Sequence, residues 1–517
     1  MERSAKQLKL AKATGERIAS VLPDDSRTWW QRPNLLKLYL LLCNFVLFAS
    51  SIGYDSAITN SIQNIPAWLT FMNDPTGTWL GFISASPFVG TCGTIFFVPW
   101  ICDRFGRKVV IYMTVLCIWI GSILGAAAKN PATYIVSRIF MGFSFSCNYA
   151  ASVWISEIAY PTTRGKFSAA YHAIYYFGSV LCAWVVFGTQ YIKDDNSWRI
   201  PLALQAAIPT CLLPALIYAP ESPRWLISVG KVDQARRVLL KFHANYEEEY
   251  LPLVELEMQE ITAGIEALRA NNISSWKSLI STPGNRKRLF ISCFLGIAFA
   301  WNGQGIVTWY LSSVLTSVGI TATWKKTLLN ACIQLFNLLV AITGAVLVDF
   351  AGRRTLFLYA TAGLFFSFIG LTTITAVYAQ LHRNIGQAII VFIFLVYAFQ
   401  AIAYAPMITS YPSELWPQAT RSKGLFTAMF FLNGATFFNI FVNPIALDAI
   451  TWRYYCIYLG VQVVIFAVIY FTFPETKGYS LEEIALIFDK DEVTQAGLET
   501  DLPEKVTSRV SVKEISD

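Results

Sequence analysis

The sequence predicts an all-α membrane protein with twelve transmembrane helices, and three observations support this fold class. Of the 517 residues, 55% are hydrophobic and only 14% are charged, whereas soluble domains carry roughly 25% charged residues. Apolar runs of roughly 20 residues, the length that a helix needs to cross a hydrocarbon core of about 30 Å, recur along the whole chain. The runs do not alternate with period two, which argues against a membrane β-barrel.

The twelve runs fall into two sets of six that are separated by a polar stretch. The first set lies at 36–58, 79–101, 109–127, 133–153, 167–189 and 200–218, and the second at 289–312, 327–348, 355–378, 387–410, 424–443 and 454–473. We therefore expect an N-terminal segment (1–34), a six-helix bundle (35–219), a helical linker (220–288), a second six-helix bundle (289–474) and a tail (475–517) that begins as a helix at 480–489.

Composition also excludes several classes of function. The formal net charge of +7 is spread along the chain, so no basic stripe indicates a nucleic-acid partner. The ten cysteines lie in or beside apolar runs without metal-ligand spacing, which is typical of buried small side chains. The three histidines are scattered, and there is no P-loop and no glycine-rich dinucleotide turn. We expect no enzyme activity, no metal and no cofactor.

Lysine and arginine predict the orientation of the bundles, because they concentrate in cytoplasmic loops. The first loop, at 59–78, has neither residue, whereas the second carries Arg104, Arg107 and Lys108. The other even-numbered loops are basic as well, and the pair 325–326 in the seventh loop runs against the trend without reversing it. The even-numbered loops, the linker and both termini are therefore expected in the cytoplasm.

Three motif pairs show that the second bundle repeats the first. DRFGRK at 103–108 matches DFAGRR at 349–354, and SEIAYPTTR at 156–164 matches SELWPQATR at 413–421. PESPR at 220–224 is echoed by PETKG at 474–478. All three pairs recur at a common interval of about 250 residues, as in transporters whose parallel repeats rock around a site near mid-membrane.

These motifs resemble the sugar porter family of the major facilitator superfamily over residues 36–490. PESPRWL at 220–226 and PETKG at 474–478 carry most of the likeness. YPSE and RSKG at 411–424 and NPIALD and WRYY at 443–455 are similar to the fungal lactose permease and cellodextrin transporter branch. The resemblance implies the major facilitator fold and a monomeric, multi-pass protein of the fungal plasma membrane. Such a protein imports a sugar by alternating access, with protons as the coupling ion.

The repeated charged residues are expected to form a cytoplasmic gate. Carboxylates at span ends can cap neighbouring helices or pair with arginine, and the resemblance implies that such bonds favour the state closed on the cytoplasmic side. A role in topology alone is the alternative. The gate residues are Asp103, Arg107, Glu157, Arg164, Glu221 and Arg224 in the first half and Asp349, Arg353, Glu414, Arg421 and Glu475 in the second.

Asp55 and Arg138 lie within predicted spans, where a charge costs several kcal/mol unless it is paired or hydrated. Counting about 1.5 Å per residue from the span ends places both in the outer half of the membrane, so we expect them to pair. In proton-coupled sugar porters the matching pair is the coupling site, with the aspartate as the proton acceptor. A permanent structural ion pair is the alternative.

A sugar site needs amide groups for paired hydrogen bonds and aromatic rings for stacking. Glycines at 303 and 305 are expected to loosen the seventh span beside the site. By pattern and by the resemblance, the expected substrate-binding residues are His172, Asn302, Gln304, Trp309, Tyr310, Asn337 and Asn433. The aromatic residues in this set have packing as an alternative role, and a lone histidine is more often a packing residue than a ligand.

Several positions depart from hexose porters. A glutamine pair of the seventh span falls at Phe299 and Ala300, a tenth-span tryptophan falls at Thr409, and His172 replaces a glutamine. These departures favour a disaccharide or oligosaccharide over a hexose. They also leave open a transporter of a non-sugar metabolite, such as a polyol, quinate or a secondary metabolite. Facilitated uniport and a non-transporting sensor are further alternatives.

Overall fold

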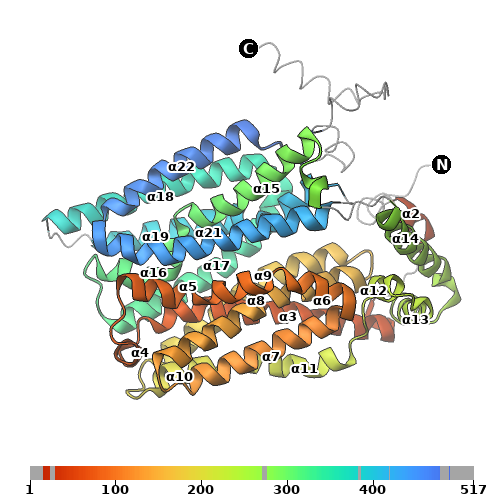
Figure 1. Cartoon of the computed structure of the whole chain (residues 1–517), viewed down its shortest axis with the longest axis horizontal. Helices are drawn as coiled ribbons and strands as arrows, with labels where there is room; N and C mark the ends of the chain where they lie inside the picture. Colours follow the sequence, from red (N-terminus) through yellow and green to blue (C-terminus); the bar gives the residue numbers. More distant parts are fainter. Residues whose placement is uncertain are drawn as a thin grey trace, which may run out of the picture.

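The computed structural model describes residues 16–23, 29–270, 276–381, 386–417, 420–477 and 488, and within these ranges the chain is helical. Figure 1 shows two groups of long, roughly parallel helices, with the first half of the chain below and the second half above. The helix expected at 480–489 lies outside the described residues, apart from Phe488.

The first half contributes six passes, of which two are built from more than one helix. α5 and α6 meet at a bend of 49°, and α10 runs into α11. Several helices begin where their sequence favours it: in α8, Asn130 Oδ1 accepts from Thr133 N at 2.8 Å and Pro131 occupies the first turn. The passes are α3 (Pro33–Ile62), α5 (Gly77–Thr94) with α6 (Phe97–Phe105), α7 (Arg107–Ala126), α8 (Pro131–Ile158), α9 (Arg164–Thr189) and α10 (Asn196–Leu204) with α11 (Ala207–Tyr218).

The second half repeats this arrangement with two broken passes. α15 and α16 are separated at Asn302 and Gly303, and α19 continues into α20 through a π-helical turn, Gln400–Tyr404. The passes are α15 (Pro283–Trp301) with α16 (Gln304–Thr316), α17 (Thr323–Ala351), α18 (Arg353–Leu381), α19 (Ile389–Phe399) with α20 (Ala405–Leu415), α21 (Arg421–Ile450) and α22 (Arg453–Thr472).

Twelve passes result within the described part of the chain, as the sequence predicts. Ten helical segments are long and apolar enough to cross a membrane by themselves, and the bent pair α5–α6 makes an eleventh. The twelfth is α8, which carries Arg138, Asn148 and Glu157. Its 28 residues are more than the roughly 20 that a span of about 30 Å requires.

Four helices outside the twelve passes cover one end of the molecule, which we call the linker face. They are α2 (Glu16–Val21), α12 (Pro223–Ser228), α13 (Val232–Phe242) and α14 (Leu251–Ala270), at the right-hand end in Figure 1. Arg32 ties the start of α3 to them, because its guanidinium stacks 3.9 Å from the centre of the Tyr250 ring and donates to His243 O at 3.1 Å. The opposite end, which carries α4 (Pro66–Phe71), is the loop face.

The two halves contact each other mainly through α5 with α21 and α9 with α17. Gly81 allows the first contact, since a Cβ at this position would lie 2.4 Å from Phe441 O. Near the loop face, Thr327 Oγ1 donates to Gln190 Oε1 at 2.8 Å and joins α17 to the residue that ends α9.

Candidate functional site

A central cavity of about 360 Å³ lies between the two halves, within the size range of roughly 300–1,000 Å³ that is typical of small-molecule sites. Both halves line it, and many of the lining side chains are amides or aromatic rings. The amides are Asn60, Gln304, Gln334, Asn337, Gln400, Asn433 and Asn439, and the rings include Phe88, Tyr149, Tyr171, Tyr175, Tyr176, Trp309 and Tyr397.

Four of the predicted substrate-binding residues line this cavity: Gln304, Trp309, Asn337 and Asn433. Gln304 Nε2 donates to Thr308 Oγ1, and Asn433 Nδ2 donates to Met429 O at 2.8 Å. Asn337 Oδ1 is buried, with no hydrogen-bond partner among the described residues. The cavity wall therefore carries some amide groups that are hydrogen-bonded to protein and at least one that has an unpartnered oxygen.

Asn302 and Tyr310, also predicted to bind substrate, are fully buried and lie outside the cavity lining. Asn302 is at the break between α15 and α16, and its Nδ2 donates to Gln400 Oε1 at 2.6 Å. Tyr310 lies at a kink within α16 and donates to Ile440 O at 2.6 Å. Their side chains turn toward protein, so they brace the wall instead of presenting groups to the cavity.

His172 lies in α9, and its side chain is outside the described residues. The three positions that depart from hexose porters, Phe299, Ala300 and Thr409, all line the cavity. These departures therefore change the surface of the cavity itself.

Several amide side chains that line the cavity were not predicted from the sequence. For those on α17, the spacing of the polar residues could have revealed them. Asn330, Gln334 and Asn337 recur at i, i+4 and i+7 along α17 and so share one helix face. Gln334 and Asn337 line the cavity. Asn330 lies nearer the loop face, where it accepts from Asn60 Nδ2 and from Gln334 Nε2, both at 3.4 Å. A polar stripe on an otherwise apolar span indicates an interior-facing surface.

Toward the loop face, residues of both halves meet at the end of the cavity. Asn60 of α3 and Asn330 of α17 meet across the halves above it. Tyr149 lines the part of the cavity nearer the linker face and is nevertheless 42% exposed.

Asp55 and Arg138 form a buried ion pair behind the cavity wall, as the depth argument predicts. Arg138 Nη1 lies 2.9 Å from Asp55 Oδ1, and the two side chains are 0% and 2% exposed. Gln205, which the sequence reasoning missed, donates from Nε2 to Asp55 Oδ1 at 2.5 Å and accepts from Arg138 Nη2 at 3.1 Å. Asp55 Oδ2 has no partner among the described residues. Ser56, the next residue, lines the cavity.

On the linker face, the charged motif of the first half forms one network. Arg107 donates from Nε and Nη2 to the two Glu157 oxygens, each at 3.0 Å, and Nη1 lies 3.6 Å from Asp103 Oδ1. Glu221 accepts from the backbone N–H groups of Arg107 and Lys108 at 3.2 Å. Since Arg107 is the first residue of α7, Glu221 caps that helix. Burial raises the pKa of the Glu221 carboxyl.

The second half repeats this network. Glu475 accepts from the backbone N–H groups of Arg353 and Arg354 at 2.8 and 3.1 Å and caps α18. Arg353 Nη2 donates to Glu414 Oε1 at 3.1 Å. Of the remaining gate residues, Arg421 Nε donates to Trp416 O at 3.4 Å, Arg164 begins α9 and Arg224 is exposed on α12. The Asp349 side chain lies outside the described residues.

Among the described residues, every salt bridge of these networks joins groups of the same half. The sequence leads us to expect bonds that form only when the two halves close on this face. In this structure the partners of each salt bridge come from neighbouring passes of one bundle, so these bonds do not require the two halves to meet.

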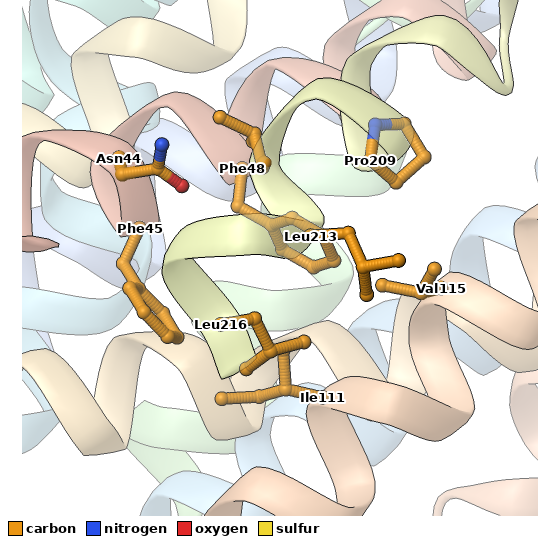
Figure 2. A pocket seen from close by; sticks show the side chains of 9 residues that line it. Asn44, Phe45, Phe48, Ile111, Val115, Pro209, Leu213 and Leu216 are labelled. Carbon is orange, nitrogen blue, oxygen red and sulfur yellow. The ribbon is translucent and has the colours of Figure 1, made fainter. Parts of the chain in front are cut away.

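A second, much smaller crevice lies between α3, α7 and α11 (Figure 2). Its volume is about 10 Å³, and apart from Asn44 its lining is apolar. Such a space holds about one water molecule at most, so it is not a substrate site.

Comparison with known proteins agrees with this architecture. The chain is 29% identical over 406 residues to the MFS-type transporter oryC of Aspergillus oryzae, which covers 75% of this chain and 74% of the relative. It is 27% identical over 476 residues to the hexose transporter HXT13 of Saccharomyces cerevisiae, covering 87% and 82%. A partially occluded inward-open structure of the xylose transporter XylE from E. coli superposes with a TM-score of 0.72 at 21% identity, covering 86% of this chain and all of XylE.

The sequence model of the family described as "Sugar (and other) transporter" matches residues 42–488. This match spans both halves, the linker between them and the networks of the linker face. The chain is therefore a membrane transporter rather than an enzyme, and it belongs to the sugar porter family of the major facilitator superfamily.

Proposed function

We propose that this protein imports a sugar across the fungal plasma membrane by alternating access and that it is a proton symporter. The observation that carries the proposal is the cavity between the halves, whose wall combines amide side chains with tyrosine and tryptophan rings. Amides can donate and accept to sugar hydroxyls, and aromatic rings stack on the weakly apolar faces of sugar rings.

A disaccharide or oligosaccharide is the favoured substrate class. Phe299, Ala300 and Thr409 line the cavity where hexose porters have polar or indole groups. Ala300 and Thr409 have smaller side chains than the glutamine and tryptophan of hexose porters and leave room on the wall. Phe299 and Ala300 lack the amide groups that would fix a single hexose ring. The motifs at 411–424 and 443–455, which resemble the lactose permease and cellodextrin branch, support the same class.

Proton coupling is proposed at Asp55. Its Oδ1 is held by Arg138 and Gln205, whereas Oδ2 is buried without a partner among the described residues. A carboxylate that can lose its arginine partner in another conformation can take up a proton in exchange. The structurally similar protein XylE is described as a proton:xylose symporter, and this supports the proposal that the present protein is coupled to protons.

We propose that the linker face is cytoplasmic and that the protein acts as a monomer with both termini inside. Arg104, Arg107 and Lys108 lie on this face, and cytoplasmic loops are enriched in such residues. With this orientation, the contacts between the halves near the loop face lie on the outer side of the membrane.

The decisive experiment is growth of a transport-deficient fungal host on lactose, cellobiose, maltose and hexoses, followed by uptake into proteoliposomes. We expect growth and uptake with at least one disaccharide. Uptake of hexoses alone would overturn the favoured substrate class, and uptake of no sugar would overturn the sugar proposal.

A second candidate, transport of a non-sugar metabolite, is favoured by the apolar side chains of Phe299 and Ala300 and by relatives named only as MFS-type transporters. Adding polyols and quinate to the proteoliposome screen separates the two. Under this alternative, uptake of one of these compounds would exceed that of every sugar.

A further inference from the structure

Gln400 occupies an unusual place in the cavity wall. It is the first residue of the π-helical turn that joins α19 to α20, and it lines the cavity. Single π-helical turns within α-helices occur frequently at functional sites. Here α17 makes room for the turn at Gly344, where a Cβ would lie 2.9 Å from Ile402 Cα.

The hydrogen bonds around Asn302 fix the orientation of the Gln400 amide. Asn302 Oδ1 accepts from Gln304 N at 3.1 Å, which leaves Asn302 Nδ2 as the donor toward Gln400 Oε1 at 2.6 Å. The oxygen of Gln400 is thereby engaged, and its Nε2 group is the free end. Among the described residues, nothing accepts a hydrogen bond from this buried nitrogen.

An unmatched buried donor is unfavourable, so another state of the transport cycle is expected to satisfy it. Gln400 is 4% exposed, and its nitrogen is covered in this structure. The acceptor must therefore arrive when the wall closes around a bound molecule. A sugar hydroxyl or ring oxygen in the cavity is the acceptor that the neighbouring wall residues Gln304 and Tyr397 would hold in place.

From this geometry we infer that Gln400 is a further substrate-binding and specificity-determining residue, whose amide nitrogen donates to one oxygen of the sugar. Through Asn302 the same side chain connects the occupied cavity to the break between α15 and α16. The inference rests on the proposed sugar transport and adds a residue to that site.

A matched control separates this role from simple bracing. Gln462 Nε2 donates to Asn302 O at 2.7 Å, so it braces the same asparagine, yet Gln462 lies outside the cavity lining. Loss of a bracing contact should affect Gln400 and Gln462 variants alike, whereas loss of a substrate contact should affect Gln400 variants alone.

The test measures uptake of D-glucose, D-xylose, lactose and cellobiose into proteoliposomes, with monodeoxy derivatives of whichever sugar the wild-type protein transports. We expect Gln400→Met to raise KM about tenfold, the weight of one hydrogen bond, with little change in Vmax. One monodeoxy derivative should be a poor substrate of the wild type and should lose nothing further in Gln400→Met. Gln462→Met should leave KM near the wild-type value.

Equal KM changes in the two variants, or an unchanged preference of Gln400→Met among the derivatives, would overturn the inference while leaving sugar transport intact. If the wild-type protein transports none of the sugars, the proposed function fails and this inference fails with it. Should Gln400→Met not fold, Gln400→Asn keeps an amide but withdraws it by one methylene group, and the same rise in KM is expected.

Discussion

Asn330 of α17 donates from Nδ2 to Ser61 Oγ of α3 at 2.8 Å. Both side chains are almost completely buried, and the bond joins the two halves directly above the central cavity. Together with the contacts of Asn60 and Thr327 described above, it joins the two halves near the loop face through uncharged groups.

We expect this contact to break when the cavity opens toward the loop face. In a background without the ten native cysteines, Ser61→Cys with Asn330→Cys joined by a short thiol cross-linker should block uptake, and reductant should restore it. Each single variant with the same reagent is the control. Uptake that continues at the wild-type rate in the cross-linked protein would show that the two helices need not separate.

Asp55→Asn should abolish accumulation of substrate against a gradient and leave exchange intact, because the amide cannot take up a proton. The measurement is proteoliposome uptake driven by an imposed pH gradient, with alkalinisation of the medium recorded on substrate addition. Asp195→Asn is the matched control, since Asp195 pairs with Arg199 at 3.1 Å but is exposed. Alkalinisation by the Asp55→Asn protein equal to the wild type would contradict proton coupling at this site.

Glu157→Gln should lower stability markedly, because Glu157 is 9% exposed and accepts two bonds from Arg107, which is 11% exposed. We expect a loss of about 1–3 kcal/mol, the cost of leaving buried polar groups without partners. Asp103→Asn should change stability by less than about 1 kcal/mol, because Asp103 is 80% exposed although it faces the same arginine. Thermal unfolding of both variants in detergent measures the difference, and equal losses would count against the network described here.

Gly303→Ala should impair transport more than Gly434→Ala. Gly303 has φ +96°, and an added Cβ would lie 2.4 Å from the Phe368 ring, so alanine would strain the break between α15 and α16. A Cβ at Gly434 would meet no atom within 4 Å. Uptake rates normalised to protein amount give the comparison, and equal rates would show that the break tolerates a side chain.

Much of the fold could be predicted because the membrane imposes a simple rule on the sequence. Long apolar runs mark the passes, and the break at Gly303 was expected from glycine content. The π-helical turn at Gln400 could not be foreseen, since nothing in its local sequence distinguishes it from a continuous helix. α4 also escaped prediction, because a helix of 6 residues carries no span-length signal.

The site was predictable where depth or a repeated motif constrained it. The pairing of Asp55 with Arg138 followed from their depth in the membrane, and the repeated networks followed from the motif pairs. Gln205 was missed because it lies within the apolar sixth span, at the junction of α10 and α11, where an uncharged amide gives a weaker signal than a charged side chain. Asn302 and Tyr310 were placed in the cavity because residue type alone does not tell which way a side chain turns at a helix break.

The contacts between the halves near the loop face that involve only uncharged side chains have a consequence for the environments in which they can form. Amide and hydroxyl groups of asparagine, serine, glutamine and threonine do not titrate in the biological pH range, and their bonds are not screened as ion pairs are. If that face meets the growth medium, these particular bonds form equally well in acidic or saline surroundings. The salt-bridge networks of the linker face would then lie in the cytoplasm, where the pH is buffered.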